Sequence, residues 1–324
     1  MNKLSTTRLI LTILIVIVHS SCFFGQSLTG PYWMYDNHYL SDKYLINPAF
    51  AGFQYYPKIF IGTQRLEMLQ DAPSVHLAGF HGRVGIKRNH SSRYLSNENG
   101  ARNALGGLVF ADNNGPYQTV GLKFDYVFSI FFRSTKSGIS FGLGGIVFSN
   151  SLRLEKYADY NDPFILENTG KNFITPDFNS GILFFHNKLY VGFSASQLME
   201  NSYKFANNGF TNSKPYRNYY LLTGYRFVFN WLEIEPSFVI GQNFAPDSYN
   251  NQGKFFDVNL ELFLKPVVFI QSFRIDGYSS CSLLYRTQRL ELGIRADLFS
   301  TDGTDAQFTG IAAILSYTFL PSNQ

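Results

Sequence analysis

Hydrophobic and polar residues alternate over long stretches of this sequence, which is the period of a β-strand and not that of a helix. Between residues 119 and 128 every second residue is apolar, and those between are mostly polar or small. The stretch 289–298 divides more cleanly, because one face is apolar and the other holds four charged residues and a glycine. The stretches 231–240 and 255–264 repeat the pattern. One face of each strand therefore suits hydrocarbon and the other suits water.

Strand length separates two folds that share this alternation. Strands of soluble sandwiches average about five or six residues, whereas a strand of about nine to eleven residues crosses a bilayer when it is tilted by about 45°. Most stretches here have the longer length, so we predict a transmembrane antiparallel β-barrel of about 14 strands. The predicted strands are 57–65, 74–86, 104–112, 117–132, 137–149, 176–186, 188–196, 217–229, 231–241, 255–264, 267–275, 278–286, 289–299 and 307–319.

Connection lengths give an independent indication of the same fold. Outer-membrane barrels keep their periplasmic turns short and their extracellular loops long, and the connections alternate between the two ends. If the first strand rises from the periplasm, the tight connections fall on the periplasmic side. They lie near 186–188, Asn230, 265–266 and 287–288, and the long connections at 150–175, 197–216 and 242–254 fall outside.

The first 25 residues have the pattern of a signal peptide. Lys3 and Arg8 form a basic start, and residues 9–18 are apolar apart from Thr12. This run is about half of the 20 apolar residues that a membrane-spanning helix needs, so we expect it to be cleaved after export. Lipidation of Cys22 is the alternative. The expected division is a signal peptide (1–25), an N-terminal periplasmic segment (26–56), an outer-membrane barrel (57–319) and a C-terminal tail (320–324).

Composition agrees with a membrane barrel. The chain has 33 Phe, 21 Tyr and 27 Gly, with 15% charged residues against roughly 25% in soluble domains. Aromatic residues form girdles at both interfaces of such barrels. The 27 basic and 23 acidic residues leave a charge near +2 once Lys3 and Arg8 are removed, which gives no indication of nucleic acid as a partner. Cys281 alone would follow the cleavage point, so we expect no disulfide framework.

Residues 44–52, YLINPAFAG, followed by QRLEMLQDAP at 64–73, resemble the opening of the PorP/SprF family, outer-membrane proteins associated with type IX secretion and gliding motility in Bacteroidetes. The resemblance implies a non-enzymatic accessory barrel that assists secretion, surface attachment or motor-linked assembly of large cargo proteins. Its implied partners are a secreted cargo protein and type IX secretion or gliding components. Further matches are LGGLVFADNNGP at 105–116, SFGLGGIVFS at 140–149, GILFFHNKLYVGFSASQL at 181–198 and YYLLTGYRFVFNWLEIEPSFVI at 219–240.

The opening motif has two interpretations, a structural elbow or a surface for a partner. Pro48 restricts Asn47 to an extended backbone, and Gly52 permits a turn just before the first strand. The family tends to show Arg-x-Gln-Trp and then Gly-Ala-Pro where this chain has Arg-Leu-Glu-Met and Asp-Ala-Pro. The family-motif residues in this chain are Asn47, Pro48, Ala49, Ala51, Gly52, Arg65, Ala72 and Pro73.

Motifs of enzymes and metal sites are incomplete in this sequence. GFSAS at 192–196 lacks the last glycine of a nucleophile elbow, and GLGG at 142–145 has no helix after it for a dinucleotide loop. The run 112–115 lacks the closing Glu of a calcium loop, and the histidines show no metal spacing. We therefore predict no catalytic, cofactor or metal site. Charged residues on the polar faces are interpreted as a lumen network: Lys123, Asp125, Glu233, Glu235, Asp257, Glu261, Arg289, Glu291 and Arg295.

Residues 87–103 form the one long connection that strand parity places on the periplasmic side. The segment carries Lys87, Arg88, Arg93 and Arg102 against only Glu98, so its basic charge could attract an acidic periplasmic partner. A docking loop for the secretion machinery, acting with residues 26–56, is one interpretation, and a solvated insertion is the other. Two functions outside secretion also stay open. A barrel of this size could be a solute channel unless residues 26–56 fold into it as a plug, and the third candidate is a membrane-embedded hydrolase.

Overall fold

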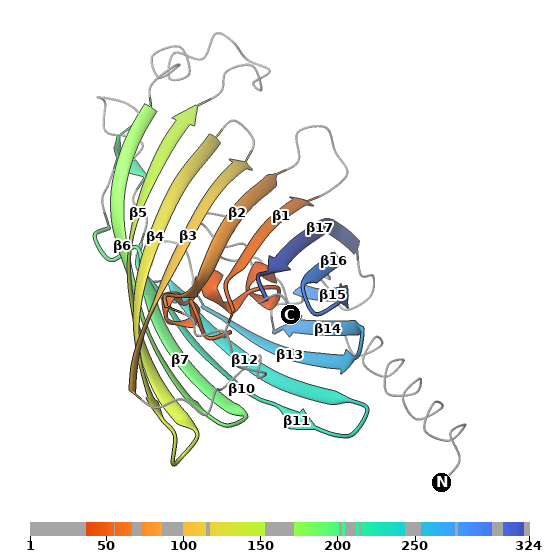
Figure 1. Cartoon of the computed structure of the whole chain (residues 1–324). Coiled ribbons are helices and arrows are strands. Elements are labelled where there is room, and N and C mark those ends of the chain that lie inside the picture. Colours follow the sequence, from red (N-terminus) through yellow and green to blue (C-terminus); the bar gives the residue numbers. More distant parts are fainter. Residues whose placement is uncertain are drawn as a thin grey trace.

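A computed structural model describes residues 37–54, 56–66, 73–85, 100–114, 117–152, 172–200, 203–204, 212–213, 216–243, 254–275, 278–299 and 307–320. Within these ranges, 14 long strands form one antiparallel barrel (Figure 1). They are β1 (Lys58–Leu66), β2 (Ser74–Arg83), β3 (Gly100–Asn114), β4 (Tyr117–Phe132), β5 (Ser137–Leu152), β6 (Asn172–His186), β7 (Leu189–Ser196), β10 (Asn218–Tyr225), β12 (Glu233–Asn243), β13 (Lys254–Leu264), β14 (Val267–Arg274), β15 (Tyr278–Arg286), β16 (Leu290–Phe299) and β17 (Gln307–Thr318).

The barrel closes because the last strand pairs with the first. β17 runs antiparallel to β1 from Lys58 opposite Thr318 to Leu66 opposite Gly310, and each other long strand pairs with its neighbours in chain order. Closure leaves no strand edge facing lipid, where an unpaired backbone group costs several kcal/mol. The all-β transmembrane barrel predicted from the sequence is confirmed. Three short strands accompany it: β11 (Phe227–Val228) pairs with β12, and β8 (Tyr203–Lys204) pairs with β9 (Asn212–Ser213).

Some strands extend beyond their predicted bounds. β3 begins at Gly100 and not at residue 104, because its partner β4 is 16 residues long and the pairing continues until Gly100 lies opposite Phe131. Arg102 therefore sits on β3 opposite Ser129 and not in a loop, which corrects the predicted boundary of the basic connection. Lys87, Arg88 and Arg93 lie outside the described residues, as does the predicted signal peptide.

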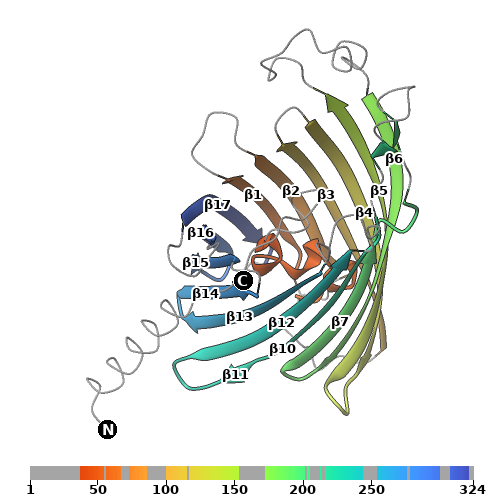
Figure 2. The same ribbon diagram turned by 180° about the vertical axis from the view of Figure 1, so that it is seen from behind.

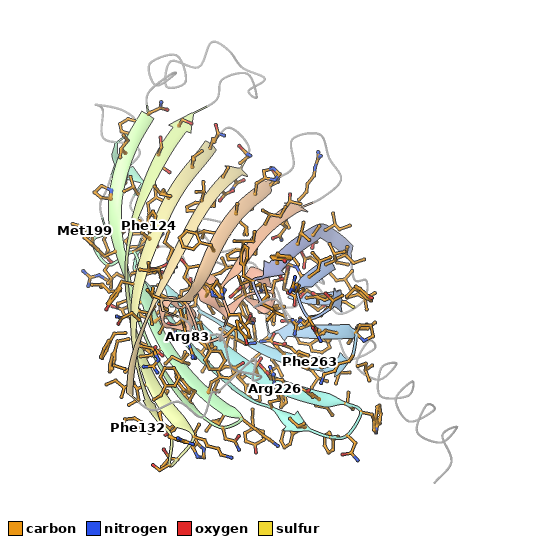
Figure 3. The ribbon with its side chains drawn as sticks, viewed as in Figure 1. Arg83, Phe124, Phe132, Met199, Arg226 and Phe263 are labelled. Atoms are coloured by element: carbon orange, nitrogen blue, oxygen red, sulfur yellow. The ribbon has the colours of Figure 1, made fainter. Side chains whose placement is uncertain are left out.

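The alternation of residues along each strand sorts them between the two faces of the wall, as predicted. On β4, Val120, Leu122, Phe124 and Tyr126 are exposed on the outer face, whereas Lys123 and its neighbour Asp125 are 2% exposed in the interior. Figure 3 shows the side chains of Phe124 and Phe132 on the wall. Outward aromatic residues gather at the end of the barrel where the turns are tight, namely Phe132, Phe184, Tyr225, Phe227, Phe229, Trp231, Tyr285 and Phe319. This set is an interfacial girdle of the kind that borders a membrane.

Substitution of Phe124 by arginine is expected to impair insertion into lipid. Phe124 is 58% exposed on the outer face near the middle of β4, and a cation at that depth costs about 2–4 kcal/mol. The fraction of heat-modifiable, folded protein after reconstitution into vesicles measures the effect. Phe124→Leu is the control because it keeps the surface apolar, and equal folding of the two variants would contradict the assignment of this face.

The N-terminal segment lies inside the barrel. Residues 37–50 contain three short 3-10 turns, which Figures 1 and 2 show within the ring of strands: η1 (Asn37–Leu40), η2 (Lys43–Leu45) and η3 (Pro48–Phe50). We call residues 39–53 the plug. A periplasmic segment and a plug were both possible for residues 26–56, and the described residues 39–53 have the plug arrangement, because buried aromatic and charged side chains hold them in the lumen. No helix in the described residues is long and apolar enough to cross a membrane.

Candidate functional site

The opening motif folds as an elbow at the centre of the plug. Asn47 has an extended backbone (φ −137°, ψ 110°), and its Oδ1 accepts a hydrogen bond of 2.9 Å from the backbone N–H of Ala49. Pro48 then occupies the first position of η3, where its missing N–H is not needed. Gly52 has a φ of +73°, and an added Cβ would lie 2.5 Å from the Cβ of Ala104. Asn47, Pro48 and Gly52 thus form a structural elbow within the plug.

Three inward glycines of the wall form the seat of this elbow. A Cβ added to Gly142 of β5 would lie 2.6 Å from the backbone N of Ala49, and one added to Gly181 of β6 would overlap the Asn47 side chain. Gly192 of β7 also faces the amide of Asn47. The seat lets the Nδ2 of Asn47 donate to two strand carbonyls, those of Ile182 and Phe193, both at 3.3 Å.

Tyr44 anchors the plug to β4. Its ring lies over Gly106, where an added Cβ would come within 2.7 Å of three ring atoms. The hydroxyl donates to Asp125 Oδ2 at 2.5 Å, and the Lys123 Nζ lies 4.7 Å from the ring centroid. Burial raises the pKa of Tyr44, and the neighbouring Asp125 carboxylate raises it further. The phenol is therefore a fixed hydrogen-bond donor within the lumen.

Asp42 and Lys43 fasten the plug to opposite walls. The Oδ2 of Asp42 lies 3.1 Å from Lys58 Nζ on β1 and 2.9 Å from His81 Nε2 on β2. The Nζ of Lys43 lies 3.1 Å from Glu235 on β12 and 2.9 Å from Glu261 on β13. We call these four contacts the ionic clasp.

The wall charges of the clasp stabilise the charged forms of the two plug residues, Asp42 and Lys43. Burial alone would raise the pKa of Asp42, but His81 and Lys58 more than offset it, so the pKa lies below its ordinary value. Burial alone would lower the pKa of Lys43, but Glu235 and Glu261 hold it well above its ordinary value. Each plug charge therefore depends on the wall charges that face it.

A further contact, from Tyr39, reaches β13. The Tyr39 hydroxyl donates to Asp257 Oδ2 at 2.8 Å, and Asp257 also pairs with Arg274 at 2.6 Å. Other strand charges pair along the wall: Lys123 with Asp125, Arg226 with Glu235, Arg286 with Glu291, and Arg295 with Asp297. The predicted lumen network is thus confirmed with one correction: Arg289 lies exposed at a turn, because β16 begins only at Leu290.

A pocket of about 320 Å³ lies between the plug and the wall at the end with the tight turns. Aromatic and charged side chains both line this pocket: Phe53, Tyr190 and Phe263 are aromatic, and Arg226 and Glu261 are charged. Arg226 stacks on Phe263 with 4.8 Å between the guanidinium carbon and the ring centroid, and Figure 3 labels both residues. No group of three or more His, Cys, Asp or Glu that could hold a metal lies within the described part of the chain.

The structure separates the two halves of the family motif. Arg65 is exposed on the outer face of β1, whereas Asn47 to Gly52 lie inside the barrel. Pro73 precedes β2, where its carbonyl accepts a 2.9 Å hydrogen bond from Leu66, and Ala72 lies outside the described residues. Sequence reasoning missed the roles of Tyr39, Asp42, Lys43 and Tyr44, because periodicity within a strand does not show which other segment packs against it.

Lipid-facing strands, an aromatic girdle and a charged lumen define this protein as a transmembrane β-barrel of the outer-membrane type, with an internal plug. The family model described as "Type IX secretion system membrane protein PorP/SprF" matches residues 31–315. The chain therefore belongs to the PorP/SprF family of type IX secretion system membrane proteins. Among curated proteins, none matches this sequence significantly.

Several solved structures are similar to this chain in fold alone. The CymD monoaromatic hydrocarbon channel has 10% identity and a TM-score of 0.49, with 91% of this chain and 95% of that chain covered. The P. putida toluene transporter TodX has 8% identity and a TM-score of 0.44, with 86% and 93% covered. A porin of Rh. blastica has 7% identity and a TM-score of 0.34, with 82% and 99% covered. The channel and transporter functions in the first two names belong to those proteins.

Proposed function

We propose that this chain is a non-enzymatic accessory barrel of the type IX secretion system in the outer membrane. In this role it assists secretion, surface attachment or motor-linked assembly of large cargo proteins, after export by its signal peptide. Membership of the PorP/SprF family supports the association with type IX secretion. Its partners in this proposal are a secreted cargo protein and other components of the secretion or gliding machinery.

The observation that carries the proposal is the ionic clasp at the centre of the barrel. Asp42 and Lys43 are adjacent in sequence, yet they bind strands that stand on opposite sides of the ring. With Asn47 seated on the inward glycines, the plug is fixed from several directions at once. A passive channel needs an open lumen, whereas a scaffold for protein partners does not. The fixed plug therefore favours the accessory role over the solute channel.

The basic connection between β2 and β3 is the proposed contact with periplasmic machinery. Strand parity places it at the end of the barrel that holds the tight turns, and Lys87, Arg88 and Arg93 give it a positive charge. Arg102 stands on β3, two residues into the strand that leaves the connection. An acidic surface of a periplasmic component fits this charge through long-range attraction.

Shortening residues 89–98 to a tight turn is expected to reduce cargo display and co-purification of machinery components without a change in barrel folding. Affinity purification from the native membrane, followed by mass spectrometry, measures the partners, and surface proteolysis measures display. The matched control shortens residues 246–250, a connection at the opposite end. If both variants retain wild-type display and partners, this connection does not dock, and if neither variant nor wild type retains any secretion component, the accessory role itself fails.

A further inference from the structure

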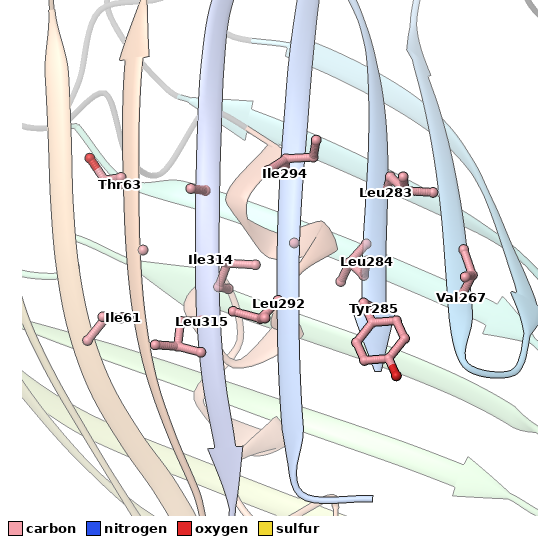
Figure 4. Close-up of a pocket in the computed structure, with 13 residues that line it drawn as sticks. Ile61, Thr63, Val267, Leu283, Leu284, Tyr285, Leu292, Ile294, Ile314 and Leu315 are labelled. Atoms are coloured by element: carbon pink, nitrogen blue, oxygen red, sulfur yellow. The ribbon is translucent and has the colours of Figure 1, made fainter. Parts of the chain in front are cut away.

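A hollow of about 560 Å³ lies on the wall formed by β1 and β14 to β17 (Figure 4). Most side chains at its surface belong to the outward, lipid-facing set and are about 37–60% exposed. The residues that frame it include Ile61, Tyr285, Leu292, Ile294 and Leu315. The hollow is therefore a depression in the surface that meets the bilayer, separate from the plug and its clasp.

Two small residues contribute to the shape of this hollow. Ala313 faces outward on β17, in register with Thr63 on one side and Ile294 on the other. Gly293 lies between the outward residues Leu292 and Ile294 and adds no side chain to the wall. The volume is within the range of about 300–1,000 Å³ that is usual for small-molecule sites. Its apolar lining suits a hydrocarbon chain, which the bilayer supplies at this face.

Exposed cations lie at one end of the hollow. Tyr285 and Val267 mark its end toward the tight turns, as Figure 4 shows. The turn between β15 and β16 carries Arg289, which is exposed and whose side chain forms no hydrogen bond or ion pair within the described part of the chain. The turn between β13 and β14 carries Lys265, whose side chain is 86% exposed although it pairs with Glu233. Neither turn contains an acidic residue.

We propose that this wall binds an anionic glycerophospholipid from the leaflet on the side of the tight turns. One acyl chain occupies the hollow, and the phosphate lies beside Arg289, with Lys265 as the second cation. Apolar surface followed by an aromatic ring and then by cations is the order in which a phospholipid presents its tail, its interface and its phosphate. The position of Tyr285 between the hollow and the turn fits this order.

The test uses the full-length protein in nanodiscs that contain palmitoyl-oleoyl phosphatidylcholine and phosphatidylglycerol in equal amounts. Native mass spectrometry after release into detergent counts the phospholipids that stay bound. Wild type is expected to retain phosphatidylglycerol in preference to phosphatidylcholine. Arg289→Gln is expected to lower that preference about fivefold, the effect of one cation at an anionic surface. Ala313→Phe fills the hollow and is expected to lower retention of both lipids.

Matched controls separate this site from a general preference for anions. Arg133→Gln removes an exposed cation from the turn between β4 and β5, and Gly145→Phe adds a ring to the outer face of β5, where an added Cβ would meet only Phe178. Wild-type lipid retention in both controls supports the site. The proposal would be overturned if the variants and the controls lost bound phospholipid equally, or if the wild type retained both lipids equally. It would also be overturned if the variants lost a bound acidic protein and no lipid.

Discussion

Replacing Gly142 by valine is expected to displace the plug. The variant barrel should then conduct ions through its lumen, whereas the plugged wild type should not. The reason is steric, because a Cβ at this position would lie 2.6 Å from the Ala49 backbone N and 2.7 Å from the Pro48 carbonyl carbon. Neither atom is the end of a flexible side chain, so η3 must move. Overpacking of this kind costs about 1–3 kcal/mol, which raises the population with a displaced plug about 5- to 150-fold.

Planar-bilayer recordings of the purified protein measure this effect. Gly145→Val is the matched control because it lies on the same strand, faces outward, and has only Phe178, at 4.0 Å, near its added Cβ. The wild type and the control are expected to show little stable conductance, and Gly142→Val is expected to conduct. A wild type that conducts as well as the variant would favour the solute-channel alternative. A folded Gly142→Val that shows no conductance would mean that the inward glycines of the seat do not keep the plug in place.

The barrel wall was predictable because its physical cause is local. Alternation along a strand such as β4 depends only on neighbouring residues, and it reports directly which side chains meet lipid. The ends of the strands were less predictable, since Gly100 joins β3 only because β4 continues beside it to Phe132. Pairing between strands decides where each one ends, and periodicity within one strand does not contain that information.

The sequence left the position of the plug segment undecided for a different reason. The constraint on Asn47 from Pro48 and the turn at Gly52 could be read from the motif, because both are properties of adjacent residues. The partners of Lys43 could not, since Glu261 is more than 200 positions away. One signal was present, namely inward-facing glycines on β5, β6 and β7. A glycine on the inner face of a wide barrel adds no side chain to the lumen, and several on adjacent strands indicate that another part of the chain packs there.

The pKa shifts of Asp42 and Lys43 predict that neither residue loses its charge within the ordinary range of pH. Asp42 has a lowered pKa, so its stabilisation is fully present above its unfolded value near 3.9 and is lost only as the pH falls through a still lower folded value. Lys43 has a raised pKa, so its stabilisation is fully present below about 10.4 and is lost only above that. Conductance is therefore expected to stay low from about pH 5 to pH 9.

Removal of the charge of Lys43 is expected to release the clasp that pH leaves intact. In Lys43→Met, Glu235 keeps its partner Arg226, but the described residues give Glu261 no other ion pair. A buried carboxylate without its partner costs about 3–5 kcal/mol, and this cost falls on the docked plug, because an undocked plug lets water reach the glutamate. The variant is therefore expected to conduct and to have a lower free energy of unfolding in a urea titration in lipid vesicles.

The matched control for Lys43→Met is Arg217→Met, which breaks the exposed pair of Arg217 with Glu200. An exposed pair contributes about 0–1 kcal/mol, so this variant is expected to resemble the wild type in both conductance and stability. Lys43→Arg keeps the positive charge near Glu235 and Glu261 and should recover part of the closure. If Lys43→Met is folded, silent and as stable as Arg217→Met, the clasp does not hold the plug, and the hydrogen bonds of Tyr39, Tyr44 and Asn47 must hold it without the ion pairs.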